Sequence, residues 1–203
     1  MKTLFTIGHS THDTETFIGL LKQHGVTAVC DVRSSPYSKF NPQFNRETLQ
    51  VVLKQHRIAY VYLGKELGPR SKDPDCYENG RASYEKIART ALFQEGLQRL
   101  KDGMKQYTIA LMCAEKDPVT CHRMILICRH MPAEEAQIAH ILEDGALENN
   151  TDAERRLMKI LKIPELQLFD TPEALVQKAY GVQGEKIAYA IDADAESGEA
   201  SLP

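Results

Sequence analysis

One apolar segment near the start of the chain restricts the fold more than any other. Residues 26–32 are nearly all apolar or β-branched, as is typical of a strand buried on both faces of a parallel sheet. Apolar residues recur at helical spacing on either side of it, in 14–24 and 46–56. Further strands are expected at 4–7 and 58–63. This alternation of strands and helices predicts right-handed βαβ units.

The alternation continues toward the C-terminus. Strands are expected at 107–112 and 136–142, and helices at 83–101, 119–130, 153–161 and 172–180. We therefore predict an α/β fold: a single domain with a mostly parallel central sheet of about five strands, flanked by helices, and with a C-terminal helical extension.

The length of 203 residues suits one well-packed domain. We assign residues 1–170 to the α/β domain, 171–191 to the helical extension, and 192–203 to a disordered tail of acidic and small residues. Residues 64–81 show no periodicity and contain several Gly-Pro, Asp-Pro and Asn-Gly turn signals. Long segments of this kind are functional lids or are disordered.

Composition indicates a water-soluble globular protein, with 42% hydrophobic and 26% charged residues. No apolar run approaches the roughly 18 residues that span a bilayer, and the first 16 residues lack the pattern of a secretory signal. We expect a cytoplasmic protein without a membrane partner. The five cysteines are scattered and odd in number, which argues against a disulfide scaffold.

Charge is distributed unevenly along the chain. Residues 1–131 carry 19 basic and 13 acidic side chains, a net charge of +6, whereas residues 132–203 carry 6 and 15, a net charge of −9. The basic part contains the candidate site described next. This distribution favours an anionic ligand, although surface charge also varies without functional meaning.

The densest collection of reactive side chains lies in one loop. Cys113, Glu115, Cys121, His122 and Arg123 place two thiols, a carboxylate, an imidazole and a guanidinium within eleven residues. An apolar strand precedes them and a helix follows. In open α/β sheets, such loops at the carboxyl ends of strands form the ligand crevice.

The start of that helix is expected to favour negative charge. With Thr120 as the N-cap, Cys121, His122 and Arg123 would occupy the first helical turn. Unpaired backbone N–H groups and the helix dipole favour an anion or a thiolate there, and an arginine strengthens the effect. We therefore expect a depressed pKa for the Cys121 thiol.

The first two strands also end in polar residues. His9 and Ser10 follow the first strand, and the second delivers Asp31 and Arg33. Because the carboxyl ends of parallel strands share one edge of a sheet, we expect a single crevice to gather these side chains with the cysteine loop. Asp31 would hold Arg33 in place by an ion pair.

Each of these side chains suggests a role. Arg33 and Arg123 suit bidentate binding of phosphate or carboxylate. His9 or His122 would transfer protons near neutral pH, although a lone histidine is more often structural.

The two loop cysteines allow three interpretations. Cys121 is a nucleophile if its pKa is depressed. Alternatively, Cys113, Cys121 and an imidazole bind zinc or iron, although the Cys-x7-Cys spacing differs from the Cys-x2-Cys of zinc knuckles. The third interpretation is that the thiols are packed in the core, which suits Cys113 at the end of a buried strand.

Several motifs, taken together and in order, resemble the DUF488 family. They are Thr-Ile-Gly-His-Ser at 6–10, Asp-Val-Arg at 31–33 with Pro36, residues 60–64 with Leu67-Gly68, Cys-Ala-Glu at 113–115, Cys-His-Arg at 121–123, His-Ile at 140–141, Asp-Gly at 144–145 and residues 183–189. The resemblance covers nearly the whole chain. It implies a compact α/β fold with the motif residues at one site, and it supplies no substrate.

Our leading hypothesis is an enzyme that acts on an anionic, phosphate-bearing substrate, such as a nucleotide or nucleic acid. The catalytic residues would be His9, Glu115, Cys121 and His122, and the substrate-binding residues Ser10, Asp31, Arg33 and Arg123. The sequence contains no Gly-x-Gly-x-x-Gly, no phosphate-loop motif and no Cys-x5-Arg, which argues against standard dinucleotide, phosphate-loop and protein phosphatase sites.

Two alternatives stay open. One is a nucleic-acid-binding module without catalysis, in which the basic part of the chain contacts phosphates. The other is a metal or thiol-redox protein that uses Cys113, Cys121 and His122. The sequence specifies no cofactor, reaction class or oligomeric state.

Overall fold

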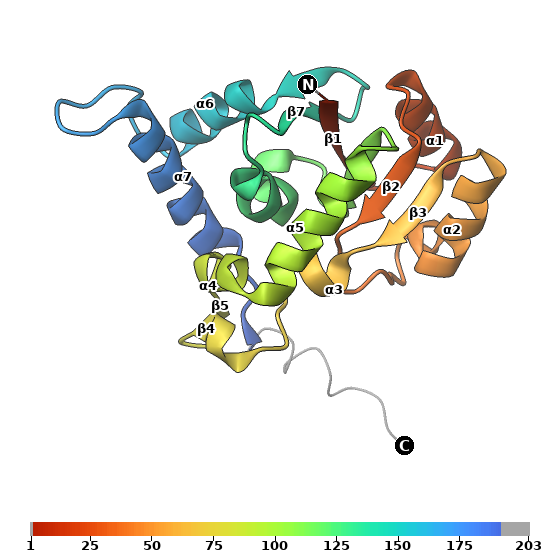
Figure 1. Ribbon diagram of the computed structural model, residues 1–203, viewed down its shortest axis with the longest axis horizontal. Coiled ribbons are helices and arrows are strands. Elements are labelled where there is room, and N and C mark those ends of the chain that lie inside the picture. The colour runs from red at the N-terminus through yellow and green to blue at the C-terminus, as the bar shows by residue number, and fades with distance from the viewer. Residues whose placement is uncertain (1, 192–203) are drawn as a thin grey trace.

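A six-stranded sheet forms the centre of the molecule in the computed structural model, which describes residues 2–191 (Figure 1). The strand order is β3-β2-β6-β1-β7-β8, and all neighbours are parallel except β7 and β8. The strands are β1 (Lys2–Gly8), β2 (Ala28–Asp31), β3 (Ala59–Tyr62), β6 (Ile109–Cys113), β7 (Ala136–Ile141) and β8 (Leu147–Asn149). The predicted α/β fold with a mostly parallel sheet is confirmed. The short antiparallel strand β8 was not expected.

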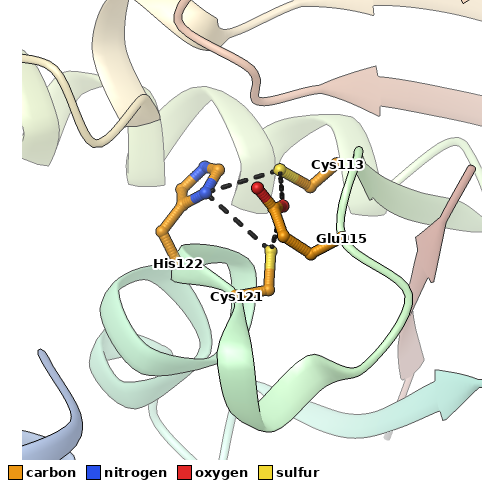
Figure 2. A group of neighbouring side chains, drawn as sticks. All are labelled: Cys113, Glu115, Cys121 and His122. Carbon is orange, nitrogen blue, oxygen red and sulfur yellow. Dashed lines mark hydrogen bonds between the residues drawn. The ribbon is translucent and has the colours of Figure 1, made fainter. Parts of the chain in front are cut away.

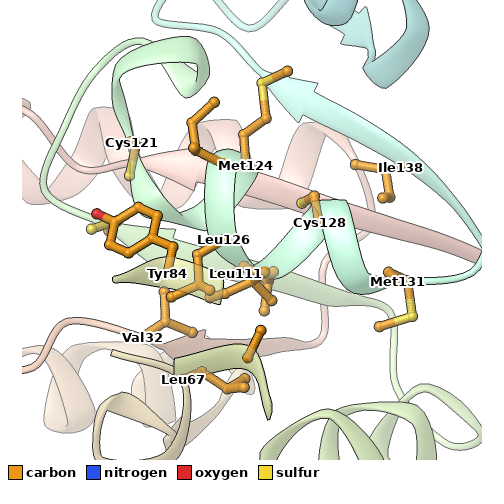
Figure 3. Close-up of a cluster of buried hydrophobic side chains, with 14 of the residues drawn as sticks. Val32, Leu67, Tyr84, Leu111, Cys121, Met124, Leu126, Cys128, Met131 and Ile138 are labelled. Atoms are coloured by element: carbon orange, nitrogen blue, oxygen red, sulfur yellow. The ribbon is translucent and has the colours of Figure 1, made fainter. Parts of the chain in front are cut away.

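Helices cover both faces of this sheet (Figure 1). They are α1 (Thr14–Gln23), α2 (Arg46–Gln55), α3 (Gly64–Leu67), α4 (Tyr84–Arg89), α5 (Ala91–Met104), α6 (Asn150–Ile160) and α7 (Pro172–Ile187). Buried side chains of α1 and α2 share one core with alternate residues of the strands, such as Ala110 and Met112 of β6. Ile109, Leu111 and Cys113 of β6 belong to the core on the opposite face, with α5 and residues 124–128. Figure 3 shows Leu111 in this core with Met124, Leu126 and Cys128.

The register of the central strands brings three carboxyl ends together. Gly8 of β1 is paired with Cys113 of β6, and Asp31 of β2 with Met112. Backbone pairing continues one residue past β1, where His9 N donates to the Cys113 carbonyl at 2.9 Å. The expected convergence of the strand ends at one edge is therefore present.

The segment expected as a helix at 119–130 is irregular. A 3-10 turn at Pro118–Thr120 is followed by a π turn at Arg123–Ile127 and a 3-10 turn at Cys128–His130. Thr120 is not the N-cap, because its hydroxyl donates to the Asp117 carbonyl. Cys121 is extended, with φ −126° and ψ 140°, and its own carbonyl accepts the first bonds of the helical segment. Cys121 therefore lies before the first turn and not within it.

The helix expected at 83–101 is two helices. Thr90 has extended backbone angles that end α4, and its side chain accepts a hydrogen bond from Phe93 N at the start of α5. A threonine hydroxyl at an N-cap satisfies a backbone N–H that would otherwise lack a partner. Apolar spacing alone did not reveal this break, because both helices bury residues on the same side.

Residues 64–81 form several short elements in the structure. Helix α3 is followed by a 3-10 turn at Pro74–Cys76 and by the hairpin of β4 (Tyr77–Glu78) and β5 (Arg81–Ala82). The end of the described chain runs beside this hairpin: Ala82 N donates to the Tyr189 carbonyl and Ile191 N to the Gly80 carbonyl, each at 2.8 Å. The segment thus has fixed partners at its C-terminal end.

The C-terminal segment expected as a helical extension, 171–191, contains α7, which packs against α6 and against residues 123–127. The tail expected at 192–203 lies outside the described residues. Among the helices of residues 2–191, none has the length and apolar character that crossing a membrane requires.

Gly8 permits the close approach of β1 to the cysteine loop, which gives a first prediction. A Cβ atom at this position would lie 1.9 Å from the Glu115 carbonyl oxygen. We expect Gly8→Ala to lower the free energy of unfolding by about 1–3 kcal/mol, as overpacking does. Urea denaturation measures this change.

Gly19→Ala is the matched control, because Gly19 lies within α1 and a Cβ there meets no atom within 4 Å. Alanine in a helix should leave stability unchanged or raise it by up to about 1 kcal/mol. Equal stability of Gly8→Ala and the wild-type protein would show that the loop can move away from β1.

Candidate metal centre

Four side chains with metal-ligating atoms meet at the carboxyl end of β6. Cys113 ends the strand, Glu115 lies two residues later in the loop, and Cys121 and His122 stand where the helical segment begins. One ligating atom from each lies within 4.8 Å of all the others. Figure 2 shows the imidazole facing both sulfur atoms, with the Glu115 carboxylate between them.

One oxygen of the Glu115 carboxylate accepts hydrogen bonds from both thiols. Cys113 Sγ donates to Glu115 Oε2 at 2.7 Å, and Cys121 Sγ donates to the same oxygen at 3.0 Å. Burial raises the pKa of the Glu115 carboxyl, but the two thiol hydrogen bonds and the charge of His122 outweigh it and lower the pKa to about 2. At neutral pH the group is therefore a carboxylate next to two sulfur atoms.

The orientation of His122 is fixed by the neighbouring strand. Its Nε2 lies 3.0 Å from the Val32 carbonyl oxygen, which can only accept, so Nε2 carries a hydrogen and donates it. Nδ1 then points at the cysteines, 3.5 Å from Cys113 Sγ and 3.9 Å from Cys121 Sγ. Metal-binding histidines are held in this way, by a backbone carbonyl on the nitrogen that does not bind the metal.

The expected depression of the Cys121 pKa is wrong. Burial is the main cause that raises the pKa of this thiol well above its usual value, and the neighbouring Cys113 adds to it. The residue is 1% exposed. The positive charge of Arg123 acts in the expected direction but is too weak to reverse the effect of burial. Cys121 is a buried, protonated thiol and a poor nucleophile without a metal ion.

The Arg123 side chain points into the protein, contrary to the substrate-binding role expected for it. The side chain is fully buried. Its Nη1 donates to the Glu115 carbonyl at 2.6 Å, its Nη2 to the Lys116 carbonyl at 2.9 Å, and its Nε to Thr6 Oγ1 at 3.3 Å. All three nitrogens thus bind the protein, and Arg123 holds the backbone of the loop that carries Glu115.

Arg33 is held rigidly beside the cluster. Its Nε and Nη2 form the expected ion pair with Asp31, at 2.9 and 2.6 Å, and Nη2 also donates to the Phe44 carbonyl. The contact with His9 at 3.1 Å uses one of the two Nη1 hydrogens. Arg33 also lines the cavity at the cluster.

His9 is not placed to transfer protons. Since a guanidinium can only donate, His9 Nε2 accepts from Arg33, and Nδ1 donates to the Ser10 carbonyl at 3.0 Å. Burial and the charge of Arg33 lower the pKa of His9 to about 4, so the ring is neutral at pH 7. His9 therefore positions Arg33. Ser10 contributes its backbone to this turn and does not line the cavity.

The cluster opens into a cavity of about 520 Å³. Its lining includes Arg33, Ser34, Arg70, Tyr84, Cys113, Glu115, His122 and Tyr189. The sequence assigned no individual role to four of these residues, Ser34, Arg70, Tyr84 and Tyr189. The Arg70 guanidinium lies 4.2 Å from the centre of the Tyr189 ring, although more than 100 residues separate them in the sequence. No local sequence pattern could have linked Arg70 with Tyr189, because only the fold brings the C-terminal segment to the side of the cavity that Arg70 lines.

A second cavity, of about 490 Å³, lies on another side of Tyr84 and is lined by Arg81, Arg129 and Glu185 among others. The four-residue cluster does not reach it. We therefore place the candidate site in the cavity at the cluster.

Comparison with known proteins identifies one family. The profile of the family described as a domain of unknown function, DUF488, matches residues 13–129. All four residues of the cluster lie within the match, whereas the wall at residues 187–190 lies beyond it. No curated protein and no solved structure matches the chain.

The buried contacts of Arg123 generate a second prediction. A lysine has one terminal nitrogen and cannot reach both carbonyls and Thr6 in the planar geometry of a guanidinium. We expect Arg123→Lys to lower the free energy of unfolding by about 1–3 kcal/mol for each buried acceptor left unpaired. Hydrogen exchange at residues 114–117 should also become faster, because the loop loses its anchor.

Arg155→Lys is the matched control, since Arg155 is exposed and pairs with Asp152 on the surface of α6. That variant should change stability by less than about 0.5 kcal/mol. If Arg123→Lys behaved like Arg155→Lys, the buried bonds would not hold the loop.

Proposed function

Since the chain belongs to the DUF488 family, whose function is unknown, we propose a function from the site itself: a metal-dependent enzyme that acts on an anionic substrate. Cys113, Cys121 and His122 would bind one divalent metal ion, zinc by preference, with Glu115 beside it. The observation that carries the proposal is the meeting of four ligating atoms within 4.8 Å at the wall of a cavity. Thiolate and imidazole ligands together favour zinc or iron over magnesium or calcium.

Two of the distances between ligands, from His122 to each cysteine, support a tetrahedral centre. With zinc–sulfur bonds of about 2.3 Å and zinc–nitrogen bonds of about 2.0 Å, neighbouring ligands of a tetrahedral site lie about 3.5–3.8 Å apart. His122 Nδ1 lies 3.5 Å from one sulfur and 3.9 Å from the other. These side chains need little movement to bind an ion, and the hydrogen bond of His122 to Val32 already fixes its ring.

The residues that line the cavity support the proposal of an anionic substrate. Arg33 is nine-tenths buried and held by Asp31, and Arg70 lines the same cavity. A guanidinium fixed by a carboxylate is well suited to bind phosphate or carboxylate oxygens with its remaining hydrogens. A bound metal ion would act on the substrate as a Lewis acid.

A thiol nucleophile is less well supported. Burial raises the pKa of Cys121, and the carboxylate of Glu115 next to it opposes a second negative charge. A divalent cation removes this obstacle, because it stabilises the thiolates that bind it. Binding of nucleic acid by the basic residues 1–131 stays a separate prediction, which a steep salt dependence of binding would favour.

Metal content tests the proposal directly. We expect the protein, purified without chelator and incubated with Zn²⁺, to retain about one metal ion per chain after dialysis. Cys113→Ser, Cys121→Ser and His122→Gln should each lower the zinc affinity by at least about tenfold, since each removes one ligand. Elemental analysis and competition with a zinc indicator measure this.

Cys30→Ala and Cys128→Ala are the matched controls, because both thiols are buried and lie outside the cluster. They should leave the zinc content unchanged. Loss of zinc in these controls to the same extent as in the cluster variants, or no zinc in the wild-type protein, would contradict the metal centre.

The anion site gives a further prediction. In the zinc-loaded protein, Arg70→Gln should weaken binding of inorganic phosphate by about tenfold, the value of one charge-assisted contact worth about 1.4 kcal/mol. Arg81→Gln, which removes the same charge outside the cavity, is the control. Isothermal titration at fixed ionic strength makes the comparison, and equal affinities of the two variants would remove Arg70 from the anion site.

A further inference from the structure

We propose that Glu115 is an internal substitute for the anionic group of the substrate. Its carboxylate occupies the fourth coordination position of the metal ion in the absence of substrate. A phosphate or carboxylate group of the substrate then displaces it. This inference rests on the proposed metal centre and goes beyond it, because it assigns an exchangeable role to one of the four residues. Four observations support it.

The first observation is that Glu115 fits the tetrahedral geometry least well. Its Oε2 lies 2.7 and 3.0 Å from the two sulfur atoms, whereas oxygen and sulfur ligands of one zinc ion lie about 3.5 Å apart. The sulfur–nitrogen distances already match. When a metal ion replaces the two thiol hydrogens, the carboxylate must therefore move outward, whereas His122 Nδ1 already lies near the tetrahedral distance from both sulfur atoms.

The second observation is exposure. Cys113, Cys121 and His122 are 3%, 1% and 4% exposed, respectively. Glu115 as a whole residue is exposed and lines the cavity, although its carboxyl is buried against the two thiols. Cys113 and His122 also line the cavity, and Glu115 is the most exposed of the four ligands. Catalytic zinc sites keep three protein ligands and leave the fourth position to water or substrate, which is the arrangement that departure of Glu115 would create.

The third observation concerns what can move. Arg123 binds the carbonyls of Glu115 and Lys116, and Gly8 lies directly against the Glu115 carbonyl. The backbone of the loop is held on both sides. Displacement of the carboxylate therefore needs only rotation about side-chain bonds of Glu115, without any opening of the loop. Rotations of exposed side chains take nanoseconds or less, so exchange would not limit binding.

The fourth observation is charge. Two thiolates, one carboxylate, a neutral imidazole and a divalent cation carry a net charge of −1. A singly charged oxyanion that replaces the carboxylate on the metal keeps that charge, and it also gains the guanidinium of Arg33 in the cavity. A neutral ligand gains neither. The exchange therefore selects a substrate that carries its own negative charge.

The test uses the full-length protein loaded with Co²⁺, whose visible absorption reports the ligands of the metal, and inorganic phosphate as the probe. We expect phosphate to change the spectrum of the wild-type protein. We expect Glu115→Gln to keep one Co²⁺ per chain and to bind phosphate at least about tenfold more tightly, because the competing carboxylate is gone. Most substitutions in a binding site weaken binding, so this direction is distinctive.

Glu143→Gln is the matched control. Glu143 pairs with Lys116 in the same region but lies outside the cluster, so this variant removes one nearby negative charge without removing the competitor. Its phosphate affinity should stay within about twofold of the wild-type value. An equal gain in Glu143→Gln would show a general effect of charge and overturn the inference.

Two further outcomes would also overturn it. If Glu115→Gln bound phosphate no more tightly than the wild-type protein, the carboxylate would not compete with anions. If the variant lost its Co²⁺, Glu115 would be a permanent ligand. In both cases the wild-type protein still holds its metal, which distinguishes these results from failure of the metal centre itself, where the wild-type protein would take up no ion.

Discussion

The buried guanidinium of Arg123 is the interaction on which the candidate site depends. A full positive charge in the core is costly unless its donors are satisfied, and here all three nitrogens bind oxygen atoms of the protein. Two of those atoms are the carbonyls of Glu115 and Lys116, in the loop after β6. This loop is thus bound to the residue that directly follows Cys121 and His122. This cation joins both ends of the loop and so helps to keep the four ligating side chains at their spacing.

Arg123 is itself held by a series of hydrogen bonds in which each residue donates to the next. Thr6 Oγ1 accepts from Arg123 and, with its single hydrogen, donates to His140 Nδ1 at 2.8 Å. His140 Nε2 must then carry a hydrogen, which it donates to Asn150 Oδ1 at 3.1 Å. Burial and the charge of Arg123 lower the pKa of His140 to about 4, in agreement with a neutral ring. The loop is therefore tied through β1 and β7 to α6.

The sequence revealed the features that depend on neighbouring residues or on the regular order of strands, and missed particular side-chain contacts between distant residues. The buried strands followed from short apolar runs such as 26–32, and the ion pair of Arg33 with Asp31 from their position at a strand end. The direction of Arg123 could not be predicted, because it depends on an irregular helical segment and on a threonine in β1. The wall formed by Arg70 and Tyr189 likewise requires contacts across more than 100 residues. The pKa of Cys121 was predicted in the wrong direction because the helix starts one residue late and burial dominates.

The effect of the Glu115 carboxylate on the two thiols depends on whether a metal cation is present. Beside two thiols it stabilises their protonated forms, since a thiolate within about 3 Å of a carboxylate would be repelled strongly in a poorly hydrated site. A divalent ion placed among the same atoms attracts all of them, and the thiols then lose their hydrogens to become ligands. Three potential anions around one point are unfavourable for a thiol nucleophile and favourable for a metal ion. The arrangement that argues against a cysteine nucleophile is therefore the strongest physical argument for a metal centre.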